Sequence, residues 1–157
     1  MRILVLGVGN ILLTDEAIGV RIVEALEQRY ILPDYVEILD GGTAGMELLG
    51  DMANRDHLII ADAIVSKKSA PGTMMILRDE EVPALFTNKI SPHQLGLADV
   101  LSALRFTGEF PKKLTLVGVI PESLEPHIGL TPTVEAMIEP ALRESGVEAI
   151  PREAIHD

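Results

Sequence analysis

The sequence predicts a three-layer α/β domain in which a twisted, mostly parallel five-stranded sheet carries helices on both faces. Five short apolar runs alternate along the chain with segments of helical spacing. Continuous apolar runs are typical of strands buried on both faces of a parallel sheet, and their alternation with helices is typical of α/β folds. The length of 157 residues is that of one domain, so residues 1–157 are expected to form a single unit.

In the first half of the chain, three apolar runs predict strands. They are residues 3–8, 35–39 and 57–60, and each is followed closely by glycine or aspartate. Apolar residues recur at helical spacing over 19–29 with charges on the opposite face, which predicts a helix. The apolar residues between Met46 and Met52 predict a further helix after the second strand.

The second half of the chain adds two strands and two helices. The strands are predicted at residues 73–77 and 114–120, and the helices at 91–106 and from 131 onwards. Ser91 before Pro92, with Gln94 three residues after the serine, is typical of a helix N-terminus closed by a capping box. We therefore expect the side chains of Ser91 and Gln94 to hydrogen-bond to the backbone of the first turn.

Composition excludes several classes of function. The chain has no cysteine, so thiol nucleophiles, Cys-ligated zinc, iron–sulfur clusters and disulfides are ruled out. Lys and Arg number 13 against 24 Asp and Glu, a formal net charge of −11, and there is no Trp. An acidic chain with few aromatic residues lacks the basic footprint and the stacking platform that nucleic acids require.

The amino-terminal apolar run is short and interrupted. Gly7, Gly9 and Asn10 break it, and no small-x-small cleavage site follows, so a signal peptide is disfavoured. No other run reaches the roughly 18 apolar residues of a membrane helix. A cytoplasmic protein without a membrane segment is the expectation.

Gly7 and Gly9 after the first strand suggest a dinucleotide-binding loop, but the fingerprint is incomplete. Its third glycine would fall at position 12, which is Leu12, and the nearest acidic partner, Asp40, lies 31 residues beyond Gly9 where about 20 is usual. The alternative is a tight turn that only glycine tolerates. Nucleotide binding remains as one alternative.

The familiar hydrolase signatures are missing as well. There is no GK[ST] after the glycines, no GxSxG elbow and no HExxH. Asp40-Gly41-Gly42-Thr43 suggests an aspartic protease, yet that mechanism needs two facing carboxylates and the chain offers no second such motif.

Three polar residues remain at the carboxyl ends of the predicted strands, where ligands of α/β sheets bind. They are Glu16, in the turn into the first helix, Asp62, after the third strand, and His93, in the first turn of the capped helix. Each also has an ordinary structural explanation as a helix-end acid, a turn former or a cap. Together they form an O,O,N ligand set for a divalent first-row metal. The helix N-terminus is expected to keep His93 neutral.

The remaining histidines are weaker candidates. His127, in the turn after the fifth strand, could approach the same edge of the sheet, whereas His57 opens a strand at the opposite edge and His156 lies in the tail. For His57 and His156 a structural role is expected.

Four motifs in order resemble the hydrogenase maturation proteases. They are residues 5–10 with 15–19, residues 40–43, residues 61–63 and residues 91–94. The resemblance spans nearly the whole chain and implies a hydrolase grouped with the aspartic-type peptidases, although without their dyad. It implies nickel ligation by Glu16, Asp62 and His93, and recognition of substrate and nickel by Asp40, Gly41, Gly42 and Thr43.

The implied activity is one endoproteolytic cut that removes a short C-terminal extension from the precursor of a nickel–iron hydrogenase large subunit. Nickel would arrive bound in the precursor, and Asp40 would orient the substrate or act as base. A monomer is expected, because a large folded client must reach the open edge of the sheet. The rivals are a non-hydrolytic nickel-checking maturation chaperone and a nucleotide-binding domain.

One segment departs from the family pattern. After Leu142 the last helix should continue for about two more turns, some seven residues at 3.6 per turn, but the chain passes directly into Arg143-Glu144-Ser145-Gly146. Either a segment is absent or the helix is shortened.

Overall fold

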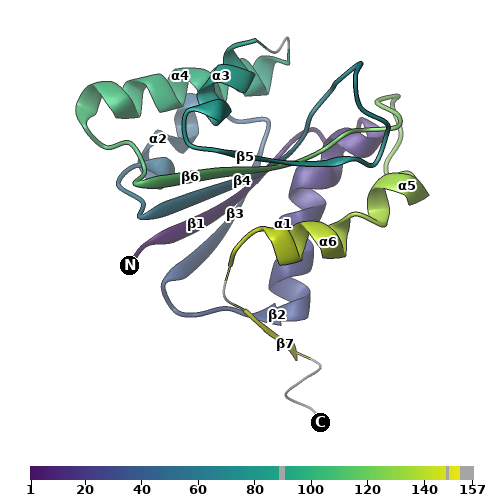
Figure 1. Ribbon diagram of the computed structural model, residues 1–157, viewed down its shortest axis with the longest axis horizontal. Coiled ribbons are helices and arrows are strands. Elements are labelled where there is room, and N and C mark those ends of the chain that lie inside the picture. The colour runs from purple at the N-terminus through teal and green to yellow at the C-terminus, as the bar shows by residue number, and fades with distance from the viewer. Residues whose placement is uncertain (89–90, 148, 153–157) are drawn as a thin grey trace.

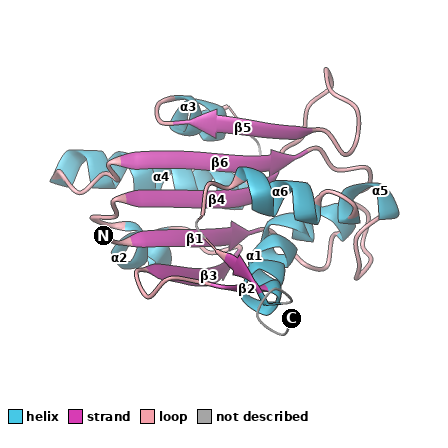
Figure 2. Ribbon diagram, turned by 60° about the horizontal axis from the view of Figure 1, so that its bottom comes forward, coloured by secondary structure: helices cyan, strands magenta, loops and turns pink. Residues whose placement is uncertain are grey.

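The computed structural model describes residues 1–88, 91–147 and 149–152. Its main sheet has the strand order β3-β1-β4-β6-β5 and lies between two layers of helices (Figures 1 and 2). The strands are β1 (Ile3–Val8), β3 (Val36–Gly42), β4 (His57–Ala63), β5 (Met74–Arg78) and β6 (Lys113–Val119). The predicted three-layer α/β fold with a mostly parallel five-stranded sheet is confirmed.

The helices cover both faces of the sheet. One layer consists of α1 (Ile18–Arg29), α5 (Pro132–Glu135) and α6 (Ile138–Glu144). The other consists of α2 (Leu49–Met52), α3 (Glu81–Thr87) and α4 (Pro92–Thr107). Two 3₁₀ turns, η1 (Thr14–Ala17) and η2 (Met46–Leu48), lead into α1 and α2.

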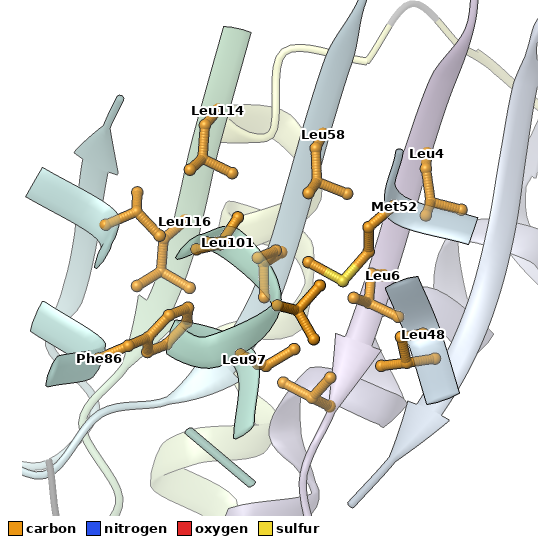
Figure 3. Close-up of a cluster of buried hydrophobic side chains, with 14 of the residues drawn as sticks. Leu4, Leu6, Leu48, Met52, Leu58, Phe86, Leu97, Leu101, Leu114 and Leu116 are labelled. Carbon is orange, nitrogen blue, oxygen red and sulfur yellow. The ribbon is translucent and has the colours of Figure 1, made fainter. Parts of the chain in front are cut away.

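Alternate residues of the central strands feed two separate cores, as the two-residue period of a strand requires. Leu4 and Leu6 of β1 point toward α2, α3 and α4, where Leu97 and Phe86 are fully buried (Figure 3). Val5 packs on the opposite face against α1 and α6. Because β1 and β4 are buried on both faces, their ends are held rigidly.

Three local features differ from the sequence-based expectation. The edge strand β5 runs antiparallel to β6, and α3 follows it where no helix was predicted. A second sheet pairs β2 (Tyr30–Ile31) with β7 (Ile150–Pro151). The helix expected from Thr131 is broken into α5 and α6, because Pro140 has no N–H to donate to the carbonyl four residues earlier.

The shortened carboxyl-terminal helix is visible in the structure. Helix α6 ends at Glu144, and Gly146 then takes a φ of 80°. The chain reaches β7 within four residues of Gly146 and closes the small sheet on β2. The early end of α6 leaves the ends of β1 and β4 in place.

Among the described residues, no helix combines the length and apolar character needed to cross a membrane.

Candidate functional site

The site begins with a close approach of α1 to the sheet. A Cβ at Gly19 would stand 2.1 Å from the carbonyl oxygen of Ala61 and 2.4 Å from that of Val8, and a Cβ at Gly7 would stand 2.4 Å from the carbonyl oxygen of Gly19. Only glycine fits such contacts. The start of α1 is therefore held against the carboxyl ends of β1 and β4.

Gly9 shapes the turn that positions Glu16. Its φ is 134°, and a Cβ there would collide with the carbonyl oxygen of Glu16. The backbone N–H of Asn10 donates to Glu16 Oε1 at 3.3 Å. The two glycines of the suspected dinucleotide loop thus serve backbone packing, in agreement with the tight-turn alternative.

Asp62 lies next to the end of β4 and is fully buried. Its Oδ1 accepts the N–H of Ala63 at 2.8 Å, and its Oδ2 accepts the side-chain amide of Gln94, also at 2.8 Å. Both carboxylate oxygens lie 3.2 Å from Nε2 of His93. A buried carboxylate needs such partners to offset the loss of hydration.

The imidazole of His93 lies between two carboxylates. Its Nε2 faces Asp62, while Nδ1 lies 3.4 Å from Glu16 Oε1 and 2.8 Å from the hydroxyl oxygen of Ser91. Only 18% of the Glu16 side chain is exposed. Three residues that are far apart in sequence thus meet at one edge of the sheet, as expected from the strand ends.

The direction of the pKa shift of His93 differs from the expectation. Burial alone lowers the pKa of His93, but the hydrogen bond to Asp62 and the negative charges of Asp62 and Glu16 outweigh it, so the net pKa is raised. Burial likewise raises the pKa of Asp62. The shift is opposite in direction to the one expected from the helix N-terminus, because the two carboxylates favour the charged ring.

Sequence reasoning missed the roles of Ser91 and Gln94. Ser91 is the N-cap of α4 but makes no side-chain cap hydrogen bond, and Gln94 donates to Asp62 and to the carbonyl oxygen of Ala63. The predicted capping box is therefore absent, because both side chains turn to the site instead. A polar Gln94 on the same helical face as the buried Leu97 and Leu101 was the signal available.

Asp40 lies apart from these contacts. It is exposed near the end of β3, and its Oδ1 accepts the backbone N–H of Gly42 at 2.9 Å. Gly41 is buried, with Leu6 and Leu48 close to where its Cβ would be, and Thr43 is exposed. No contact among the described residues joins Asp40 to Glu16, Asp62 or His93, so its role in substrate recognition stays a prediction.

Asp15 holds the loop after β6 in place by hydrogen bonds. This fully buried carboxylate accepts the backbone N–H groups of Glu122, Ser123 and Thr131, and the Thr131 hydroxyl. The loop after β6 is thereby fixed beside η1. Since Asp15 directly precedes Glu16, the same contacts fix the backbone of Glu16.

The other histidines occupy different places. His127 is exposed and joins the loop at Leu13 through backbone contacts, without a described side-chain contact to the cluster. His57 lies at the opposite edge, with its Nε2 2.8 Å from the hydroxyl oxygen of Thr115. His156 lies outside the described residues.

The side chains of Glu16, Asp62 and His93 are of the kinds that bind metal ions, but here they contact one another. Glu16, His93 and Asp62 supply oxygen and nitrogen donors, but each is engaged with another member. In the part of the chain that the structure describes, no group of three or more His, Asp or Glu side chains is arranged to hold a metal ion. Ligation would require these hydrogen bonds to be exchanged for metal bonds.

Comparison with known proteins identifies relatives along the whole chain. The family described as hydrogenase maturation protease matches residues 20–145. The hydrogenase 2 maturation protease of Escherichia coli K12 is 95% identical over 164 residues, covering 100% of both chains. HoxM of Azotobacter vinelandii, a hydrogenase expression/formation protein, is 46% identical over 97% of this chain and 77% of its own.

Solved structures agree. The hydrogenase maturating endopeptidase HybD of E. coli superimposes with a TM-score of 0.94 at 94% identity, over 98% of this chain and 99% of that one. HybD of Thermococcus kodakarensis, at 24% identity, shares the fold with a TM-score of 0.76 over 92% of this chain and 96% of its own. The 164-residue alignment is longer than the 157 residues of this chain, so the E. coli relative carries residues that are absent here. A match to the family over most of the chain, together with relatives of this identity, shows that the chain belongs to the hydrogenase maturation protease family.

Proposed function

We propose that this chain removes a short C-terminal extension from the precursor of a nickel–iron hydrogenase large subunit and recognises nickel bound in that precursor. The observation that carries the proposal is the buried contact of His93 with both Asp62 and Glu16, in a member of this protease family.

The three side chains would complete the coordination of the nickel that the substrate carries. Glu16 and Asp62 offer carboxylate oxygens and His93 offers a ring nitrogen, a set that suits a divalent first-row metal. Bound metal would polarise the scissile carbonyl or lower the pKa of a water molecule. Recognition would then test whether the precursor has been loaded with nickel.

The chain's own groups orient the site side chains and favour protonation of His93. Gln94 fixes the Asp62 carboxylate, and the hydroxyl of Ser91 lies beside Nδ1 of His93. The carboxylates of Asp62 and Glu16 raise the pKa of His93 against the effect of burial, so they favour the protonated ring, and metal ligation by this ring would require loss of that proton. Asp40 would orient the substrate from the end of β3 or act as base.

The surface around the cluster suits a protein substrate. Large exposed apolar side chains follow the carboxyl ends of β1, β3, β4 and β6 or lie in the first turn of α4; they are Ile11, Leu12, Met46, Val65, Leu95, Leu124 and Ile128. Exposed apolar groups of this kind are typical of docking surfaces. We propose that the precursor docks here on a monomer in the cytoplasm.

The test is the mass of a large-subunit precursor after incubation with the protein, with the precursor once loaded with nickel and once metal-free. Loss of a C-terminal peptide only from the loaded precursor is expected. Cleavage in both samples would overturn the role of nickel as the recognition element. Binding without cleavage in either sample would favour the chaperone alternative.

A further inference from the structure

A pocket of about 550 Å³ adjoins the cluster between the start of α4 and the loop after β4. Its wall includes Ser91 and Gln94, the side chains that contact His93 and Asp62, and the opposite wall is the loop 65–68 that follows β4. The size is within the range of about 300–1,000 Å³ that is usual for ligand pockets. A group bound here would lie next to the reacting centre.

Two adjacent cations lie on this pocket. Lys67 and Lys68 are exposed and line it together with Val65. The cations that form ion pairs among the described residues, apart from His93, are Arg21, Arg29, Arg55, Arg105 and Lys112. Both lysines are thus available to a ligand, in a chain whose net charge is −11.

The loop is anchored close to the site. The N–H of Ile64, two residues after Asp62, donates to the carbonyl oxygen of Val119 at 3.0 Å, and the N–H of Lys68 donates to the hydroxyl of Ser66 at 3.2 Å. The first bond anchors the start of the loop to β6, and the second is a local turn within the loop. The loop therefore leaves the sheet two residues after Asp62, which brings Lys67 and Lys68 to the wall of the pocket.

We propose that this pocket receives the C-terminal extension of the precursor and that Lys67 and Lys68 bind carboxylate groups of that extension. The inference rests on the proposed function and adds to it the place and the charge of the departing peptide. A peptide that follows the scissile bond must leave along a wall of the site, and the wall formed by Ser91 and Gln94 opens into this pocket. Every such extension carries at least one carboxylate, at its terminus, and the lysines offset the repulsion that it meets elsewhere on an acidic protein.

The first experiment is steady-state cleavage of the nickel-loaded precursor by the wild type, by the double variant K67E/K68E and by K112E/K113E. The last pair is the control for the loss of two adjacent charges, since Lys112 and Lys113 are also exposed but lie at the opposite edge of the sheet. Because Lys112 pairs with Asp56, thermal unfolding of this variant checks that it is folded under the assay conditions. We expect KM to rise about tenfold in K67E/K68E, with kcat within about twofold of the wild type. The control should keep both constants. An unchanged KM in K67E/K68E, or a loss confined to kcat, would overturn the proposal.

The second experiment measures binding of the synthetic extension peptide, as free acid, as C-terminal amide and with its acidic side chains replaced by amides. For the wild type, we expect at least one of the two neutralised peptides to bind several-fold more weakly than the free acid. For K67E/K68E, we expect that same peptide to bind no more weakly than the free acid. Which peptide loses affinity identifies the carboxylate that is bound. Equal affinities of all three for the wild type would overturn the proposal. Peptide binding does not require cleavage. If the wild type failed to cleave the precursor, that result would count against the proposed function, and the binding comparison would still decide the role of the lysines.

Discussion

Gln94 joins the first turn of α4 to the end of β4 by donating its side-chain amide to Asp62 Oδ2 at 2.8 Å and to the carbonyl oxygen of Ala63 at 3.0 Å. The contact bridges 32 residues of sequence. It holds the Asp62 carboxylate beside His93, so Gln94 is a positioning residue of the site.

Replacing Gln94 by Leu should lower processing of the precursor about 10- to 100-fold, because the carboxylate it orients loses a donor. The pKa of Asp62 should rise further, since the hydrogen bond from Gln94 lowers it. The acidic limb of the pH–rate profile should therefore move to higher pH. Gln28→Leu, at an exposed position of α1, is the control, and an unshifted profile in Gln94→Leu would reduce the role of Gln94 to packing.

Replacing Ser91 by Ala should affect activity more than stability. Loss of an N-cap hydrogen bond usually costs about 1 kcal/mol, but Ser91 makes no such bond, so the free energy of unfolding should change by less than that. Processing should fall, because the Ser91 hydroxyl contacts Nδ1 of His93. The control is Ser102→Ala, on the exposed side of α4, and urea unfolding and processing rates are measured for both variants. A loss of about 1 kcal/mol of stability in Ser91→Ala together with normal activity would contradict a role of Ser91 in the site.

Glu16→Gln should reduce processing to below about 1% of the wild type while preserving the fold, because a neutral amide is a poor metal ligand but still accepts the N–H of Asn10. Thermal unfolding and mass analysis of the precursor measure both effects. Glu27→Gln, exposed on α1, should cut normally. A Glu16→Gln variant that still cuts would remove this residue from the site.

Gly19→Ala should destabilise the fold by about 1–3 kcal/mol or more, because its Cβ would stand 2.1 Å from the carbonyl oxygen of Ala61. Gly50→Ala is the matched control, since nothing lies within 4 Å of a Cβ there, and alanine is the better helix former. Chemical unfolding of both variants checks the difference. Equal stabilities would show that α1 does not depend on this close approach.

Stability should respond in opposite senses to the protonation of two histidines. The pKa of His93 is raised mainly by Asp62, against burial, so its stabilising charge is complete below the unfolded pKa of about 6.5 and is lost as pH rises through the higher folded value. Burial, and then the charge of Lys113, lowers the pKa of His57, so His57 destabilises the fold as pH drops below about 6.5.

Urea unfolding of the wild type, His93→Gln and His57→Gln between about pH 5.5 and 8.5 tests these signs. The stability advantage of the wild type over His93→Gln should shrink with rising pH, and its advantage over His57→Gln should grow. The same slope in both comparisons would contradict the assignment.

The architecture, and the edge of the sheet at which the cluster forms, could be predicted from local patterns in the sequence. Apolar runs such as residues 3–8 and the helical period over 19–29 depend on local spacing, and parallel strands bring their carboxyl ends to one edge whatever their exact register. For that reason Glu16, Asp62 and His93 could be grouped before their contacts were known.

The contacts of those residues, and the direction in which the pKa of His93 shifts, depend on the packing of the folded chain. Ser91 and Gln94 have the spacing of a capping box, yet their side chains hydrogen-bond to His93 and Asp62, because a buried ring and a buried carboxylate lose more when left without partners than a partly solvated helix end does. The raised pKa of His93 likewise follows from two carboxylates that are distant in sequence. Such contacts depend on the distance between side chains across packed elements, and local spacing along the chain contains no record of that distance.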